Sequence, residues 1–270
     1  MPEFLEGPMK LLPVAILGFY LTACSDYAVA PQQAMPAPKE IVDLGVLITE
    51  STPEEFWGRG FINEMGYTES NSFEVIQWEF GPVSGSNSYY RLFNHGGPHV
   101  DAPNHVGLGG GLDSYAVESF AGPLKVFDFS ELAIGRSITE EMLVDLPIAA
   151  GDVVLIYTGF PIPAAEEGWP EAVALTYEAA MYLAAIPIRA IGTDAYNVES
   201  MTDQSEVPAD DKIAKIIPGH YAFLSKNIPV FEQLVNIEKL LDKTNMYFVG
   251  APLNIEDGDG MMVRPLVLVY

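Results

Sequence analysis

The stretch NHGGPHVDAPNH, residues 94–105, holds three of the four histidines in a chain of 270 residues. His95, His99, Asp101 and His105 all stand at odd positions. Two glycines and a proline separate the first two histidines, and such residues cost several kcal/mol in a helix interior, so a helix is not expected. In an extended segment, residues at even separations share a face. The sequence therefore predicts a cluster of three imidazoles and one carboxylate.

This set of side chains predicts a metal site. Imidazole and carboxylate groups together suit zinc, manganese or iron. His95, His99 and Asp101 supply three ligands, which leaves room for water or substrate, and His105 is then free to act as a general base or acid. A single histidine is more commonly a surface residue or a satisfied core donor. Three histidines with an aspartate, in a chain that has only one other histidine, favour the site.

Charge and cysteine content exclude several classes of function. The chain has 13 Lys and Arg against 37 Asp and Glu, a formal net charge of −24. Nucleic-acid binding needs a basic footprint, and docking on anionic lipid needs positive charge as well. We therefore expect a small-molecule substrate and no nucleic acid. The single cysteine rules out an intrachain disulfide and any CxxC metal site.

The N-terminal region predicts a secreted protein with a lipid anchor. MKLLPVAILGFYLTAC, residues 9–24, has one basic residue, an apolar run too short for a comfortable membrane span, and a lipobox-like end at Cys24. The alternative is a buried strand or helix with a chance cysteine. Residues 1–8 are interpreted as a cloning remnant or misplaced start, and 25–40 as a tether rich in Ala, Pro and Gln. The folded domain is expected at 41–270, in the periplasm or at the cell surface, touching membrane only through the anchor.

Short β-branched segments bounded by turn residues predict seven strands, at 41–49, 74–80, 124–130, 152–158, 188–194, 246–251 and 263–270. Pro265 confines the last strand to a sheet edge or to a late start. Four helices are expected, at 137–146 after a capping box, at 170–184 with proline in its first turn, at 208–217 and at 237–243. Strands interleaved with helices predict a single mixed α/β domain.

The stretch HGGPHVDAPNH resembles the HxGTHxDxPxH motif of the cyclase-like metal-dependent hydrolases, the group that includes bacterial kynurenine formamidase and isatin hydrolase. The likeness continues through GDVVLIYTG, AIGTDA and APLNIEDGDG and covers most of residues 41–270. It implies the swivelling β/β/α type of fold and a homodimer. Pro98 stands where the family usually has threonine, which removes a hydroxyl that could orient a ligand.

The resemblance also assigns the site residues. It implies five metal ligands, namely His95, His99, Asp101, His220 and Glu232. The last two would complete a second metal position bridged by Asp101, and His105 would be the catalytic histidine. The expected cofactor is one or two divalent ions, zinc or manganese. On spacing alone, His220 could equally be a turn histidine and Glu232 a charge at a helix N-terminus.

The activity that the resemblance implies is hydrolysis of a carbon–nitrogen bond in a small aryl formamide, amide or cyclic amide by metal-activated water. A lactone or ester hydrolase and a non-catalytic metal- or small-molecule-binding periplasmic lipoprotein are the alternatives. A polar histidine such as His105 beside an open metal position favours chemistry over binding alone. Asp194 is expected either to face the site or to cap a turn, and Phe56 and Trp57 either to line a pocket or to pack in the core.

Overall fold

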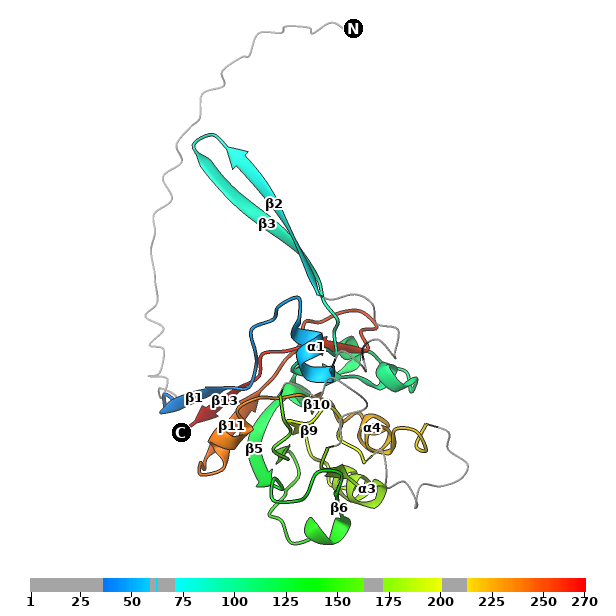
Figure 1. Cartoon of the computed structure of the whole chain (residues 1–270). Helices are drawn as coiled ribbons and strands as arrows, with labels where there is room; N and C mark the ends of the chain where they lie inside the picture. The colour runs from blue at the N-terminus through cyan, green and yellow to red at the C-terminus, as the bar shows by residue number, and fades with distance from the viewer. Residues whose placement is uncertain (1–35, 59–61, 63–70, 163–171, 201–212) are drawn as a thin grey trace, which may run out of the picture. The chain divides into compact units, whose positions relative to one another are not determined.

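The computed structural model describes residues 36–58, 62, 71–162, 172–200 and 213–270. Within them lies one large curled sheet with the strand order β1-β13-β11-β5-β7-β9-β10-β4-β12. Its central strands run parallel, β5 (Ala121–Asp128), β7 (Val153–Tyr157), β9 (Ala190–Thr193) and β10 (Val230–Glu232). Antiparallel strands extend the sheet on both sides (Figure 1).

The antiparallel strands on the β5 side are β1 (Glu40–Asp43), β13 (Leu266–Val269) and β11 (Met246–Val249). Those on the β10 side are β4 (His99–Asp101) and β12 (Gly260–Met262). A mixed sheet with parallel strands at its centre is the α/β arrangement that the sequence predicts, and the single mixed α/β domain is confirmed.

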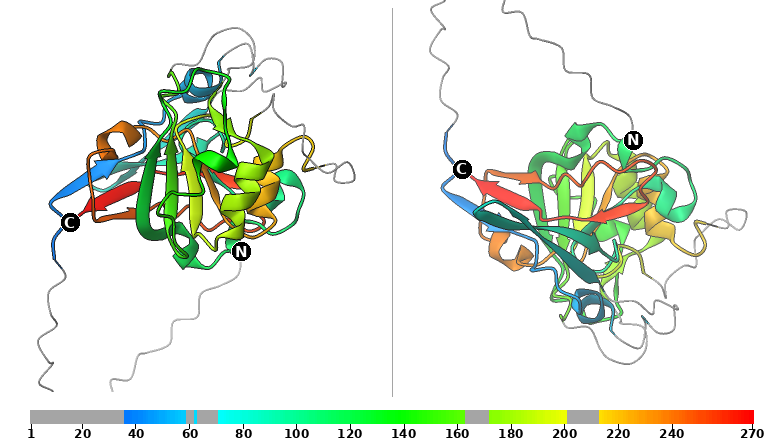
Figure 2. Two further views of the ribbon diagram at one scale, coloured as in Figure 1. Left: turned by 90° about the horizontal axis from the view of Figure 1, so that it is seen from below. Right: turned by 90° about the horizontal axis from the view of Figure 1, so that it is seen from above.

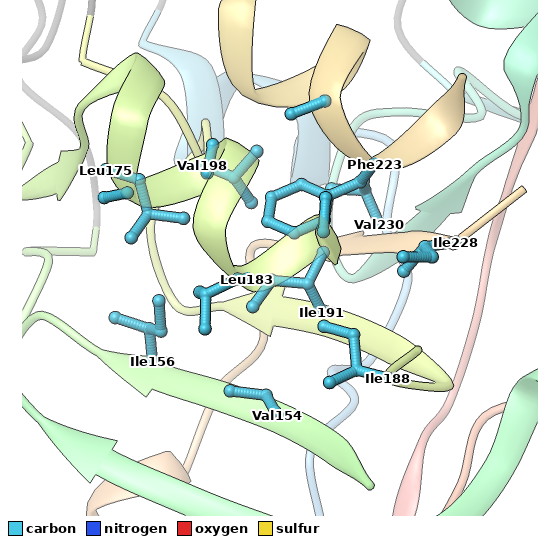
Figure 3. Close-up of a cluster of buried hydrophobic side chains, with 14 of the residues drawn as sticks. Val154, Ile156, Leu175, Leu183, Ile188, Ile191, Val198, Phe223, Ile228 and Val230 are labelled. Carbon is cyan, nitrogen blue, oxygen red and sulfur yellow. The ribbon is translucent and has the colours of Figure 1, made fainter. Parts of the chain in front are cut away.

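Both faces of β7 are buried, which explains why its sequence is a continuous apolar run rather than an alternating one. Val154 and Ile156 face a core formed with α3 (Tyr177–Ala185) and α4 (Pro218–Leu224). Figure 3 shows Leu183 and Phe223 packed over these strands. Val153 and Leu155 face a second core, which also contains Phe231 and Phe248. Figure 2 shows the curved course of the sheet's strands from two further sides.

The remaining elements are short, apart from one hairpin. β2 (Ser72–Phe80) and β3 (Val83–Arg91) pair only with each other among the described strands. β6 (Ser137–Ile138) and β8 (Ala174–Leu175) form a small parallel ladder. α1 spans Thr52–Trp57. The described residues also contain five 3-10 helices: η1 (Pro103–Val106), η2 (Leu112–Ser114), η3 (Val117–Phe120), η4 (Glu140–Met142) and η5 (Ile237–Leu240).

All seven predicted strands are present, most of them shorter than expected. β13 begins directly after Pro265 and lies between β1 and β11, so this proline marks a late start and not an edge. Sequence patterns missed β3, which is rich in serine, and missed the short strands β4, β10 and β12, which are only three residues long.

The helix predictions were less accurate. Ser137 lies in β6 and not at a helix N-cap, and the following helix is the single 3-10 turn η4. The helix expected from Pro170 begins at Tyr177, because Thr176 caps it by accepting a hydrogen bond from the Ala179 N–H. Of the helix expected at 208–217, the described part forms a turn, and α4 follows it. The helix expected at 237–243 is the 3-10 helix η5.

Residues Ala37–Tyr270 form one compact unit, which contains both cores. The segments expected at 1–8 and 9–24, with Cys24, and most of the tether expected at 25–40 lie outside the described residues. Among the helices that the structure describes, none has the length and apolarity needed to cross a membrane.

Candidate metal centre

Strand β4 places the first site residues in the middle of a three-strand ladder. Its neighbours β10 and β12 pair antiparallel with it, so that His99 lies opposite Glu232 and Asp101 lies opposite Gly260. His99 and Asp101 are two residues apart and point to the same face of the sheet. The register therefore brings the Glu232 carboxylate from β10 next to the two candidate ligands on β4.

His95 joins this face from the turn before β4. Its Nδ1 lies 2.8 Å from Asp101 Oδ1, and His99 Nε2 lies 3.3 Å from the same oxygen. Gly97, at φ +138°, makes the turn possible, and its N–H donates to Gln233 Oε1 at 2.7 Å. Gly260 makes room for the imidazole, because a Cβ there would meet His95 Cε1 at 2.5 Å.

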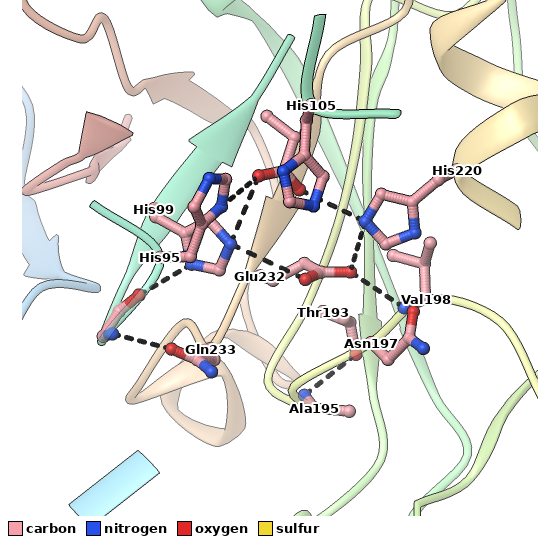
Figure 4. Close-up of polar contacts among 12 residues, drawn as sticks. His95, His99, His105, Thr193, Ala195, Asn197, Val198, His220, Glu232 and Gln233 are labelled. Atoms are coloured by element: carbon pink, nitrogen blue, oxygen red, sulfur yellow. Dashed lines mark hydrogen bonds and ion pairs between the residues drawn. The ribbon is translucent and has the colours of Figure 1, made fainter. Parts of the chain in front are cut away.

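His220, from α4, approaches Asp101 from the other side. Its Nε2 lies 3.4 Å from Asp101 Oδ2 and 3.5 Å from Glu232 Oε1. Asp101 therefore stands between two groups of possible ligands, one with His95 and His99 and one with His220 and Glu232. Figure 4 shows the four histidines and Glu232 gathered around this point. All five residues that the sequence predicts as ligands lie together, and all are buried.

Each of the three inner imidazoles is held by one nitrogen and points the other inward. His95 Nε2 contacts Asp259 Oδ2 at 3.0 Å, His99 Nδ1 contacts the Gly97 carbonyl at 2.8 Å, and His220 Nδ1 contacts Glu199 Oε2 at 2.8 Å. Such outer partners fix ring orientation and tautomer in metal sites. The inward nitrogens are therefore His95 Nδ1, His99 Nε2 and His220 Nε2.

The inward-facing atoms fit a cation. Four of them are buried and form no hydrogen bond with the residues that the structure describes: His95 Nδ1, both oxygens of Asp101, and His220 Nε2. Buried polar atoms without partners cost about 1–3 kcal/mol each. Imidazole nitrogens and carboxylate oxygens are the donors that zinc and manganese accept. One or two divalent ions held by the two ligand groups would give these atoms partners.

Burial and neighbouring charges shift the pKa values of the clustered histidines and of Glu232. Burial lowers the pKa of His95, but its contacts with Asp101 and Asp259 outweigh burial and raise that pKa to about 9. Burial also opposes protonation of His220, yet the charges of Glu199 and Glu232 raise its pKa well above the ordinary value. Burial dominates at His99, whose pKa is lowered. Burial raises the pKa of Glu232.

His105 lies at the solvent-facing edge of the cluster, on η1. Its side chain is 33% exposed, and its ring centroid lies 4.1 Å from that of His95 and 5.6 Å from that of His220. Its Nδ1 is 4.0 Å from Asp259 Oδ2. An imidazole that is open to solvent and next to the ligands is placed to exchange protons with a substrate.

Two acidic residues that contact the clustered histidines were not predicted as site residues from the sequence. Glu199 lies in the segment NVES and also accepts a hydrogen bond from the His220 N–H at 2.9 Å. Asp259 lies in IEDGDG and accepts from Asn94 Nδ2 at 2.9 Å; its contacts with His105 and His95 hold its pKa well below the usual range. Both come from irregular segments far along the chain, where no periodic pattern marks them.

The structure gives Asp194 and Phe56 one of their two expected roles and gives Trp57 a contact with the site. Asp194 caps a loop by accepting from the Thr158 and Phe160 N–H groups, so it has the turn role. Phe56 is buried by packing, being only 2% exposed. Trp57 donates through Nε1 to the His95 carbonyl at 2.7 Å, which holds the backbone of His95 in place. The Gly97 carbonyl orients His99, so Pro98 leaves that ring with a partner.

Replacing Glu199 is expected to weaken metal binding. In Glu199→Gln the carboxylate that holds His220 Nδ1 is lost, and loss of such outer partners lowers metal affinity about 10- to 100-fold. Competition with a chromophoric chelator measures this affinity. Glu178→Gln, in the first turn of α3, is the matched control and should bind metal like the unmodified chain. Unchanged affinity in Glu199→Gln would show that His220 needs no carboxylate partner.

Fold and site together define a class: α/β proteins with a buried cluster of histidines and carboxylates that could hold a metal ion, beside a mixed sheet. The family model described as "Putative cyclase" matches residues 37–200, which is more than half of the chain. The chain belongs to this cyclase family, as its motif indicated.

Individual relatives support the same assignment. The chain is 32% identical over 184 residues to "Kynurenine formamidase" of Salinibacter ruber, covering 66% of this chain and 77% of that protein. Isatin hydrolase A from Labrenzia aggregata has a similar structure, with a TM-score of 0.67 and 25% identity over 85% of this chain and 93% of that one. A structure described as a predicted metal-dependent hydrolase from Bacillus stearothermophilus gives a TM-score of 0.59 and 25% identity, over 84% and 97%.

Proposed function

We propose that this protein is a metal-dependent hydrolase that cleaves the carbon–nitrogen bond of a small aryl formamide or cyclic amide. The observation that carries the proposal is the set of buried atoms around Asp101 that form no hydrogen bond with the described residues, with every inner imidazole already fixed by an outer partner. A relative that is a kynurenine formamidase and a neighbour that is an isatin hydrolase support the bond class.

The residues divide into holders of the ion and a proton carrier. His95, His99 and Asp101 form one possible ligand group, and Asp101, His220 and Glu232 form another. A divalent ion bound there would lower the pKa of water and polarise a carbonyl. Zinc or manganese suits these nitrogen and oxygen donors. His105, exposed at the edge, would carry a proton to or from the reacting groups.

The test combines metal content with turnover. The purified protein would be analysed for bound metal, loaded with zinc or manganese, and assayed on N-formylkynurenine and on isatin. Stoichiometric metal and turnover of either compound are expected. Bound metal with no turnover of either, but with hydrolysis of lactones or other esters, would replace the proposed bond class. A protein that binds no metal after loading would contradict the proposal at its base.

Metal binding is expected to release protons at neutral pH. In the metal-free protein the pKa of His95 is about 9 and that of His220 is also raised, so both rings hold a proton at pH 7. Ligand nitrogens must be deprotonated, so the metal competes with these protons. Apparent affinity should therefore rise about tenfold per pH unit for each proton displaced while the pH lies below the raised pKa, and for His95 this rise should level off near pH 9.

Calorimetry in two buffers with different ionisation enthalpies measures the released protons directly. The difference between the two apparent enthalpies at pH 7 should correspond to one or two protons per bound ion. Equal enthalpies in both buffers would show that the ligands are already neutral in the metal-free protein.

A further inference from the structure

A pocket of about 480 Å³ lies at the end of the sheet where the parallel strands β7, β9 and β10 begin. Gly151 comes just before β7, Arg189 just before β9 and Ile228 just before β10, and all three line the pocket. Figure 3 shows Ile188, another lining residue, on the same side of the core as Ile228. Small-molecule sites in proteins commonly have volumes of about 300–1,000 Å³, and this pocket lies within that range.

The pocket is separate from the candidate metal centre. None of the described residues that line it belongs to the cluster of histidines and carboxylates. Glu232 is the last residue of β10, whereas Ile228 precedes that strand, so about 13 Å of extended chain separates the two at roughly 3.3 Å per residue. His220 lies in the first turn of α4, and Lys226, which lines the pocket, follows the end of that helix. A small ligand in the pocket would therefore leave the metal centre free.

Two basic side chains, Arg189 and Lys226, line this pocket. The chain has only 13 Lys and Arg against 37 Asp and Glu, so carboxylate partners are abundant. Yet neither Arg189 nor Lys226 forms an ion pair with any of the described residues, in contrast to Lys243 and Arg264. Glu118 is the acidic residue of the lining, and it pairs with neither of the two. The pocket therefore offers two cationic groups to a ligand.

The guanidinium group of Arg189 is held in place before any ligand binds. Its Nη1 donates to the Ala121 carbonyl at 2.8 Å. Gly122 leaves room for the stem of the side chain, because a Cβ there would lie 3.1 Å from Arg189 Cδ. Arg189 Nη2 lies beside Gly151, where a Cβ would be 4.0 Å away. A guanidinium has five N–H donors in a fixed fork, which matches the two oxygens of a carboxylate, and the donors not used by Ala121 form no hydrogen bond with the described residues.

The rest of the lining favours a ligand with one negative charge and an apolar body. Ala184, Ile188 and Ile228 are buried and apolar, and they form one wall of the pocket. Two cations against Glu118 leave the lining with a net charge of about +1. α3 ends at Ala185, and the C-terminal end of a helix carries partial negative charge, which disfavours a second charge on the ligand. A phosphate group carries about −1.5 to −2 at pH 7, so a single carboxylate fits better.

We propose that this pocket is a second ligand site, which binds a small monocarboxylate with an apolar body. Arg189 and Lys226 hold the carboxylate, and the apolar body packs against Ile188 and Ile228. The proposal is independent of the hydrolase activity, because no residue of the metal centre takes part in it.

Titration calorimetry of the purified protein with benzoate tests the proposal. Benzoate should bind saturably, and the amide NMR signals of Gly151 and Asn227, which both line the pocket, should shift as it binds. Arg189→Met and Lys226→Met should each lower the affinity for benzoate about 10- to 100-fold, because each loses a hydrogen bond between charged groups. Benzyl alcohol has the same ring without the charge, and it should bind at least about tenfold more weakly than benzoate.

Lys239→Met is the matched control, since it removes an exposed lysine on η5 that does not line the pocket, and it should bind benzoate like the unmodified protein. Lys226 is exposed as well, so Lys226→Met tests the site even if Arg189→Met fails to fold. A protein that binds no benzoate, or binds it equally well in Lys226→Met, would overturn the proposal. Benzoate binding that leaves the signals of Gly151 and Asn227 unshifted would place the ligand elsewhere. Inorganic phosphate that displaces benzoate at equal concentration would reveal a general anion site and not the proposed carboxylate site.

Discussion

Asp101→Asn is expected to abolish stoichiometric metal binding and to lower hydrolysis by about 1,000-fold or more. Asp101 is fully buried and is the single carboxylate common to both ligand groups. Its oxygens face His95, His99 and His220, and the histidine charges around it hold its pKa well below the usual value although burial opposes ionisation. An amide has no negative charge to offer the ion. Loss of a ligand should exceed the 10- to 100-fold cost of losing an outer partner.

The effect of Asp101→Asn is best measured by metal content together with thermal unfolding. A ligand that binds only the folded protein raises the midpoint temperature of unfolding. Added zinc or manganese should therefore raise the midpoint of the unmodified protein and leave that of Asp101→Asn unchanged. Asp152→Asn is the matched control, because Asp152 is also buried but serves a turn by accepting from the Ala149 N–H. Asp101→Asn with full metal content would refute the shared-ligand role.

The clustering of the five proposed ligands was predicted from the sequence because a specific motif carries most of them, but the geometric argument for the first three was only partly right. His99 and Asp101 do share a face of an extended strand. His95 lies in the preceding turn and His105 lies on a 3-10 helix. The expectation that all four residues share one face of an extended segment is therefore wrong for these two. His95 reaches the cluster because Gly97 adopts a positive φ and Gly260 leaves space for its ring.

The outer layer of the site could not be predicted, for a physical reason. Glu199 contacts His220 and Asp259 contacts His95, and each reaches its partner from a segment more than twenty residues away in sequence. Such contacts depend on the three-dimensional course of loops and leave no pattern of hydrophobic periodicity. The continuous apolar run of β7 made that strand predictable. Strands β4, β10 and β12 have only three residues each, which is too few to show a periodic pattern.

His105→Ala is expected to keep the metal and lose turnover. The imidazole lies beside the ligand cluster but is one-third exposed, and the residue sits on a surface turn, so its removal should cost little stability. Loss of a positioned acid or base lowers kcat by about 100- to 10,000-fold. Metal content measured on the same sample should equal that of the unmodified protein. Added imidazole should restore part of the activity, since a diffusible base can occupy the space that the side chain leaves.

The competing role for His105 is that of a ligand, because His95, His105 and Asp259 also lie close enough together to hold an ion. In that case His105→Ala would lose metal and turnover in equal measure, and imidazole would restore both. Asn104→Ala alters the same 3-10 turn without touching an imidazole, and should change neither quantity by more than a fewfold. Metal content that is unchanged in His105→Ala while kcat falls separates proton transfer from ligation, because a ligand cannot be removed without a loss of affinity.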